Sequence, residues 1–264
     1  MPELIDTLYP RRCPSTGPGQ TCLLCPEPVR LIVCLPAQVA HERHQLAAHL
    51  IAALTPHVAA PTGLLDGGHF LLWHRPDDTE TPLLLMPTAD PDIPDLTWCA
   101  GGPVGLLDLQ ATAAHLRRVV ADDVTEWRAL VDGTPPALPW WHYLDEHRAD
   151  PHRYPLTDAV GDFTTQPRIA AMAGAPGTPY SGDMYGPGLE ALHAGADDYA
   201  DYQAGLLTYG DGLISLDGDL LVPAFTPTLV EQTLPERRLY HRRARHYIRT
   251  LDPAVVLAAV RCFR

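Results

Sequence analysis

The chain has 264 residues, a hydrophobic fraction of 46 % and a formal net charge of −13, the composition of an acidic globular protein. All 19 basic residues other than histidine are arginine, which excludes the lysine-dependent P-loop nucleotide hydrolases, protein kinases and Schiff-base enzymes. The serines are Ser15, Ser181 and Ser215, and none of them lies in the G-x-S-x-G turn of the α/β-hydrolases.

The cellular location is predicted from the absence of two kinds of segment, membrane-spanning helices and secretory signals. No apolar run approaches the roughly 18 residues of a membrane-spanning helix. The opening residues, MPELIDTLYPRRC, lack the apolar core of a secretory signal. The sequence therefore predicts a soluble cytoplasmic protein without membrane contact. In a reducing compartment, clustered cysteines bind metal or take part in chemistry more often than they form disulfides.

A Pro- and Gly-rich loop over residues 10–28 carries the most specific motif. Eight, two and eight residues separate the cysteines Cys13, Cys22, Cys25 and Cys34. The two-residue gap between Cys22 and Cys25 is typical of a metal knuckle, so the sequence predicts a structural zinc site. The fourth ligand is open between Cys34 and the nearby His41 or His44. Packing or free thiols, and redox or [2Fe–2S] chemistry, are the alternatives.

The elements predicted after this loop alternate between strands and helices. VRLIVCL (29–35) predicts a strand buried on both faces, and residues 37–58 predict a helix. HFLLWHR and PLLLMP flank a polar tip and predict a hairpin, while LTWC predicts a short strand. AGGPVG (100–105) is either a plain turn or an anion-binding loop. A long helix over 106–131 follows, with Asp108 near its start.

A change of character near DGTPPALP (132–139) predicts a linker. It would separate an α+β domain over 1–131 from a mainly helical region over 139–264, although the two could pack as one domain. In the second region we expect helices, a hairpin over 212–223 that turns at Asp217-Gly218, and two final helices divided at Asp252-Pro253. The expected fold class is α+β, with a small mixed sheet and packed helices before a mainly helical half.

Histidines and carboxylates offer a second candidate site. His142, Asp145, Glu146 and His147 lie together in WWHYLDEH and could bind a hard metal or act as acid and base. The Gly- and Pro-rich segment 173–188 has the composition of an active-site lid. Solvated helix faces and a plain connector explain the same residues without catalysis.

The carboxy-terminal segment is locally basic. Residues 236–264 contain eight arginines against Glu236 and Asp252, a local charge of +6, so the rest of the chain carries −19. One predicted helix face carries Arg238, Arg242, Arg245 and Arg249; another carries Tyr240, Ala244, Tyr247, Ile248 and Leu251 and should face the core. The arginines could pair with Asp197, Asp198 and Asp201, with a protein partner or with a second copy. No nucleic-acid binding is expected from so acidic a chain.

Two functional hypotheses follow from these features. The first is a binding or assembly protein with a cysteine-held structural metal. The second is a metal-dependent or His/carboxylate-dependent enzyme with 173–188 as its lid.

Overall fold

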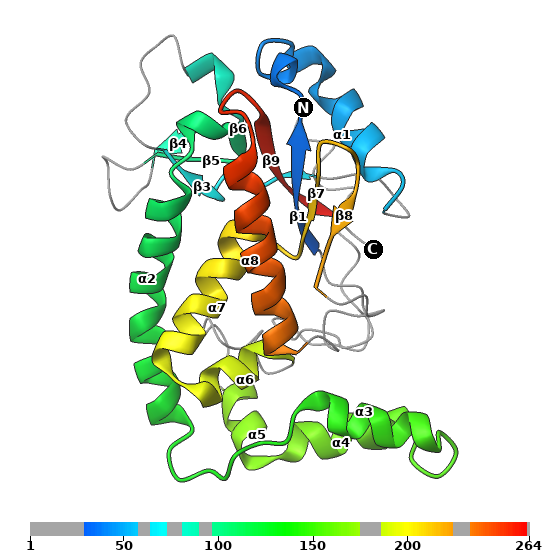
Figure 1. Cartoon of the computed structure of the whole chain (residues 1–264). Helices are drawn as coiled ribbons and strands as arrows, with labels where there is room; N and C mark the ends of the chain where they lie inside the picture. Colours follow the sequence, from blue (N-terminus) through cyan, green and yellow to red (C-terminus); the bar gives the residue numbers. More distant parts are fainter. Residues whose placement is uncertain are drawn as a thin grey trace, which may run out of the picture.

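The computed structural model describes residues 29–57, 64–72, 81–89, 97–174, 186–223 and 233–262, without the side chains of residues 64 and 121–123. These residues form an α+β fold, the class predicted from the sequence, and they contain two sheets (Figure 1). Its strands are β1 (Val29–Leu35), β2 (Leu64–Leu65), β3 (Phe70–Leu71), β4 (Thr88–Ala89), β5 (Thr97–Cys99), β6 (Gly101–Pro103), β7 (Gly212–Ile214), β8 (Leu220–Leu221) and β9 (Val256–Cys262). Its α-helices are α1 (Leu46–Leu54), α2 (Leu109–Leu130), α3 (Trp140–Ala149), α4 (Leu156–Thr165), α5 (Pro167–Ala173), α6 (Pro187–Ala194), α7 (Ala196–Tyr209) and α8 (Leu234–Thr250). Shorter 3-10 helices span Ala37–Ala40, Arg43–Gln45, Thr81–Leu83 and Val104–Leu106.

The centre of the main sheet is β1, which confirms the expectation from its continuous hydrophobicity. It pairs in parallel with β7 on one side and antiparallel with β9 on the other. The short strand β8 pairs with β7 and forms one edge of the sheet. On the edge that faces away from β1, β9 pairs with β6 along the first half of β9 and with β2 near the end of β9. Every β1 side chain except that of Arg30 is buried.

The last strand corrects a prediction. Residues 253–262 were expected to form a helix, but they form β9 within the main sheet. Both faces of β9 are covered by other elements. Its apolar residues therefore follow one another directly and lack the alternation of apolar and polar residues that is typical of a half-buried strand. Its small residues Ala258 and Ala259 have high helix propensity, and the pairing with β1 overrides that preference.

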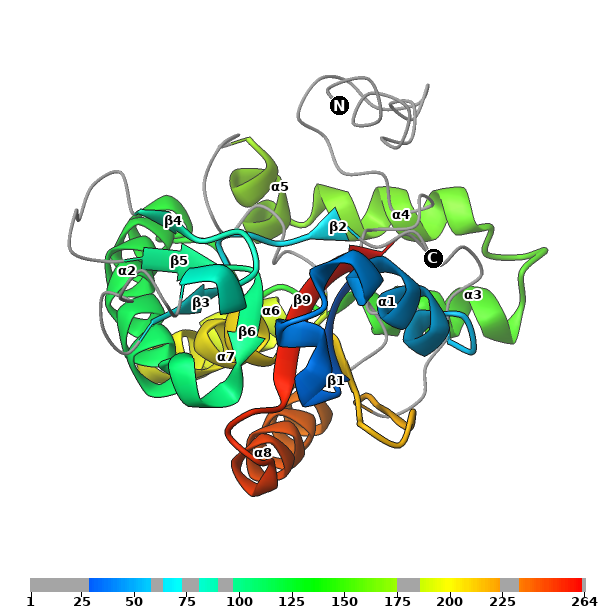
Figure 2. The same cartoon turned by 90° about the horizontal axis from the view of Figure 1, so that it is seen from above.

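The two faces of the main sheet are covered by different helices, α1 and α8 (Figure 2). Val29, Leu31, Val33 and Leu35 of β1 share a cluster with Leu50 and Leu54 of α1. Ile32 and Cys34 point to the opposite face, where they share a cluster with Tyr240, Ala244 and Ile248 of α8. The predicted core stripe of this helix is therefore confirmed.

Two hairpins were predicted, and one of them is present. The β7–β8 hairpin turns at Asp217-Gly218, where Gly218 has a φ of +85° that suits glycine. The prediction of a hairpin between HFLLWHR and PLLLMP is wrong. In the described part of these segments, β3 pairs with β5, and Leu85 instead bridges to Gly101.

The helices on the other side of the molecule have their own core. It is built from residues of α2 to α7, including Val124, Trp127, Phe163, Ile169 and Tyr199. Asp108 caps α2, because its side chain accepts a hydrogen bond from the backbone N–H of Ala111 at 2.7 Å. None of the described helices is both long and apolar enough to cross a membrane.

The main sheet contains strands from both sides of the predicted linker. Its central strand β1 comes from the 1–131 region, and the neighbours β7 and β9 come from the 139–264 region. Each region therefore completes the sheet of the other. A boundary near 132–138 stays a prediction about chain organisation, and it does not divide the sheet in two.

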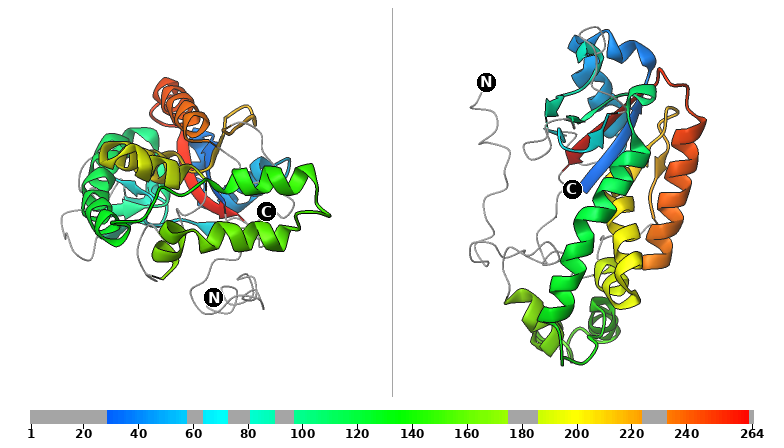
Figure 3. Two further views of the ribbon diagram at one scale, coloured as in Figure 1. Left: turned by 90° about the horizontal axis from the view of Figure 1, so that it is seen from below. Right: turned by 90° about the vertical axis from the view of Figure 1, so that its left-hand side faces the viewer.

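Helices α3 and α4 form a pair that we call the arm. They lie side by side at the end of the molecule furthest from the main sheet and project from the helical core (Figure 1, Figure 3). Trp140 of α3 and Phe163 of α4 join the two helices, with ring centroids 5.4 Å apart, and both rings belong to the helical core.

Candidate functional site

The predicted zinc ligands fall in different parts of the chain. Cys13, Cys22 and Cys25 lie outside the described residues. Within the described residues, no three His, Cys, Asp or Glu side chains come close enough together to hold a metal ion. The zinc site therefore stays a prediction.

Cys34 occupies an unfavourable position for a ligand. Its side chain is 3 % exposed in the core between β1 and α8, and burial raises the pKa of its thiol to about 12. Cys25 precedes Val29 by four residues, so to reach Cys34 it would have to run back along β1 almost fully extended. Both sides of β1 are already paired, and both of its faces are covered. These observations favour the alternative that Cys34 is a small buried hydrophobe.

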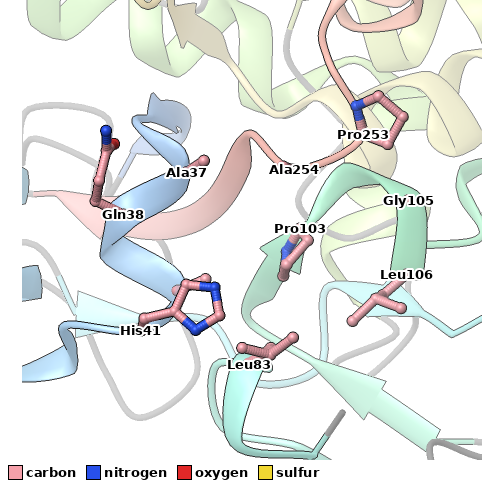
Figure 4. A pocket seen from close by; sticks show the side chains of 10 residues that line it. Ala37, Gln38, His41, Leu83, Pro103, Gly105, Leu106, Pro253 and Ala254 are labelled. Carbon is pink, nitrogen blue, oxygen red and sulfur yellow. The ribbon is translucent and has the colours of Figure 1, made fainter.

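His41 and His44 lie beyond the carboxyl end of β1, on 3-10 turns, and both are exposed. His41 borders a cavity of about 540 Å³ that is lined mainly by apolar side chains, including Leu83, Pro103 and Pro253 (Figure 4). Among the residues that line this cavity, His41 is the single titratable side chain. The cavity therefore lacks a described acid–base pair.

The WWHYLDEH cluster is distributed around the arm. His142 and Glu146 approach each other to 3.5 Å, and Asp145 lies 3.7 Å from Arg148 on the same helix. His147 instead bonds through Nδ1 to the backbone oxygen of Tyr154 at 2.9 Å, which ties α3 to the start of α4. The arrangement is that of solvated helix faces. Most of the proposed lid, residues 175–185, lies outside the described residues, so the enzyme hypothesis stays a prediction.

The AGGPVG segment is part of the main sheet rather than an anion-binding loop. Gly101–Pro103 forms β6, which pairs with β9. The next two amides are occupied, because Val104 N–H donates to the Val255 carbonyl at 2.8 Å and Gly105 N–H donates to the Pro253 carbonyl at 2.9 Å.

A partly buried ionic cluster, which the sequence did not reveal, lies at the amino end of β1. Arg30 Nε and Arg261 Nε lie 2.8 and 3.3 Å from Asp66 Oδ2, and these arginines are cross-strand partners on β1 and β9. Burial alone would raise the pKa of Asp66, but the two guanidinium groups outweigh it and hold the pKa below its ordinary value. Asp66 is therefore a carboxylate that joins the loop before β3 to the main sheet.

His69 completes this cluster as a neutral group. Its ring is 3 % exposed, and Nε2 lies 3.2 Å from the backbone oxygen of Thr208. Burial, reinforced by Arg30, lowers the pKa of His69 to about 3. The 3.9 Å approach of Nδ1 to Asp66 is therefore not an ion pair at neutral pH. A buried neutral histidine of this kind is a structural group rather than an accessible base.

A second buried pair anchors α8. Arg237, which is 2 % exposed, donates from Nη1 to Asp211 Oδ1 at 3.0 Å, and the other oxygen of Asp211 accepts from the Arg30 backbone N–H at 2.9 Å. His241 lies one turn further along the helix against Gly205 of α7. Burial, with a smaller contribution from Arg237, lowers the pKa of His241 to about 3.

The predicted arginine row is present on α8, and we call Arg238, Arg242, Arg245 and Arg249 the arginine face. Arg238 forms an ion pair with Asp198 of α7, which confirms one of the expected internal partners. Asp201, another expected partner, instead pairs with Arg117 of α2 at 2.7 Å. The remaining three arginines are exposed, and none has a hydrogen-bond or ion-pair partner within the described residues.

Comparison of the chain with family models, curated proteins and solved structures found no match in any of the three. Function is therefore inferred from the chain's own residues.

Proposed function

We propose that this protein is a cytoplasmic binding or assembly protein that recognises an acidic protein surface through the arginine face. The observation that carries the proposal is the exposure of Arg242, Arg245 and Arg249 without a partner in the described chain. Arginine's planar fork can donate two parallel hydrogen bonds to a carboxylate, which gives such a contact direction as well as charge.

The backbone under the arginine face is rigidly placed. Thr233 and Glu236 form a capping box at the start of α8, and Glu190 of α6 accepts a hydrogen bond from the Leu234 N–H at 2.6 Å. On the inner side, the Tyr240 hydroxyl donates to the Tyr209 carbonyl at 2.6 Å. A partner would therefore meet arginines on a preformed helix, which lowers the ordering entropy of binding.

Carboxylates fit this face better than nucleic-acid phosphates. Asp198 and Asp201 lie on the neighbouring helix α7, and the chain outside the carboxy-terminal segment carries −19. A long polyanion would approach these charges together with the arginines, whereas a compact acidic patch need not.

A charge reversal tests this proposal. Arg242→Glu with Arg245→Glu should weaken binding to a short glutamate peptide by roughly 10-fold or more at low salt, because two attractive contacts become repulsive. Fluorescence anisotropy of the labelled short glutamate peptide measures the effect. The matched control is Arg118→Glu with Arg128→Glu, which makes the same charge change at two exposed positions of α2. Equal losses in both variants, or salt-sensitive DNA binding that only the first variant loses, would exclude the proposal.

A structural zinc ion held by Cys13, Cys22 and Cys25 belongs to the same proposal, on the strength of the two-residue knuckle. The position of Cys34 in the core favours a fourth ligand other than its thiol.

Two cysteine variants test the zinc site. Cys22→Ala is expected to abolish zinc binding and to lower the melting temperature, because the binding energy of a structural metal is folding energy. Cys34→Ala should keep its zinc and lose about 1 kcal/mol of stability from lost packing. Elemental analysis and thermal denaturation of each purified variant provide the two measurements. A Cys34 variant without zinc would show instead that this thiol is a ligand.

A further inference from the structure

The arm carries a patch of opposite charge to the arginine face. Its exposed carboxylates are Asp145, Glu146, Asp150, Asp158 and Asp162. Asp158 and Asp162 lie one turn apart on α4, and neither has a cationic partner within the described residues. Asp162 accepts a hydrogen bond from the Tyr154 hydroxyl at 2.8 Å, and Asp158 accepts one from the Thr157 hydroxyl at 3.3 Å. Both carboxylates therefore keep their charge unpaired at the surface.

Two tyrosines show that this negative charge extends across both helices of the arm. Burial, reinforced by Asp162 and then Glu146, raises the pKa of Tyr154 to about 12. The same two carboxylates act with burial to raise the pKa of Tyr143 on α3. Glu146 of α3 and Asp162 of α4 therefore belong to one acidic patch. Within the described residues, Asp145 pairs with Arg148 and Glu146 approaches His142, whereas Asp158 and Asp162 have no cationic partner.

The arginine face and the arm are separated within one molecule. The arm lies beyond the amino end of α8, whereas Arg242, Arg245 and Arg249 occupy the half of α8 nearer the main sheet (Figure 1, Figure 3). No ion pair joins the described residues of the two elements. Each patch is consequently available to a second molecule.

The charges on the two elements have matching spacing. Arg245 and Arg249 are four residues apart on α8, and Asp158 and Asp162 are four residues apart on α4. Residues four apart in an α-helix lie about 6 Å from each other on the same side. Two helices placed side by side would bring both carboxylates opposite both guanidinium groups at once.

We propose that the acidic arm of a second copy of this chain docks on the arginine face. The inference rests on the proposed function and names its partner. Because each chain carries both patches, a two-fold arrangement forms the contact twice, as in an isologous dimer. Each contact pairs charges that are unpaired in the single chain. The dimer depends on charge and is therefore weakened by salt.

A charge swap between the two patches tests this pairing in the full-length chain. Arg245→Glu with Arg249→Glu places two carboxylates at the contact positions of the arginine face, and Asp158→Arg with Asp162→Arg places two guanidinium groups at the contact positions of the arm. At roughly 100 µM protein and about 50 mM NaCl, we expect the unmodified chain to sediment as a dimer and each variant alone to sediment as a monomer. An equimolar mixture of the two variants should sediment as a dimer again, because every contact in the mixed dimer joins opposite charges. The Arg118→Glu, Arg128→Glu variant should dimerise like the unmodified chain.

The outcomes separate this inference from the proposed function. A monomeric unmodified chain, or a mixture that stays monomeric, would overturn docking by the arm. If such a monomer still bound the short glutamate peptide through the arginine face, the proposed function would stand with an acidic partner other than this chain. A dimer that survives either pair of substitutions would show that copies associate through another surface.

Discussion

The substitution Gly101→Ala is expected to lower the free energy of unfolding by about 3 kcal/mol or more. A Cβ atom at this position would lie 1.9 Å from the carbonyl oxygen of Leu257, and Gly101 has a φ of +151°. Leu257 cannot move away easily, because β9 is paired with β1 on its other side. Urea denaturation followed by circular dichroism would measure the loss.

Gly161→Ala is the matched control. Gly161 lies inside α4, and no atom would come within 4 Å of a new Cβ there. Alanine should raise stability by roughly 0.5–1 kcal/mol, because it is the better helix former. If Gly101→Ala instead unfolded at the same urea concentration as the unmodified protein, β6 would not lie against β9.

Acid is expected to destabilise the fold steeply between about pH 6.5 and pH 3. The folded protein keeps His69 and His241 neutral, with a pKa of about 3 for each ring, whereas an unfolded histidine has a pKa near 6.5. Below pH 6.5 the unfolded chain therefore binds protons that the folded protein does not. Stability falls with decreasing pH by up to about 1.4 kcal/mol per pH unit for each histidine. Asp66 adds to the loss of stability at the low end of this pH range. The folded state stabilises its carboxylate, and protonation at low pH removes that stabilisation.

One substitution isolates the contribution of His241. His241→Gln removes one of the two buried rings. In this pH range it should reduce the slope of the unfolding free energy against pH by the equivalent of about one bound proton. His246→Gln changes an exposed histidine of the same helix and should leave the slope unchanged. Urea denaturation at a series of pH values gives both slopes. Identical slopes for His241→Gln and the unmodified protein would mean that the His241 ring accepts a proton in the folded state.

Elements with a local cause could be predicted from the sequence. The β-branched run of β1 and the turn at Asp217-Gly218 act on residues close by in the chain. The strand β9 has no such local cause. Its conformation depends on pairing with β1, more than 200 residues earlier, and on helices that cover both of its faces.

The candidate site divides in the same way. The arginine face could be predicted, because helical periodicity alone places its residues on one side of α8. The ionic cluster around Asp66 could not. Its arginines are cross-strand neighbours only because β1 and β9 pair in one particular register. Finding the cluster would require knowledge of the register between β1 and β9.

The position of β1 between β7 and β9 also has a consequence for biosynthesis. The ribosome makes β1 early and its partner β9 more than 220 residues later. At typical synthesis rates of about 5–20 residues per second, the strand waits roughly 10 to 45 s for that partner. The core of α2 to α7 is built from contacts closer in sequence and can form during this interval. We therefore expect the nascent chain to carry a folded helical part while β1, its most apolar strand, still lacks β9 and is a binding segment for chaperones.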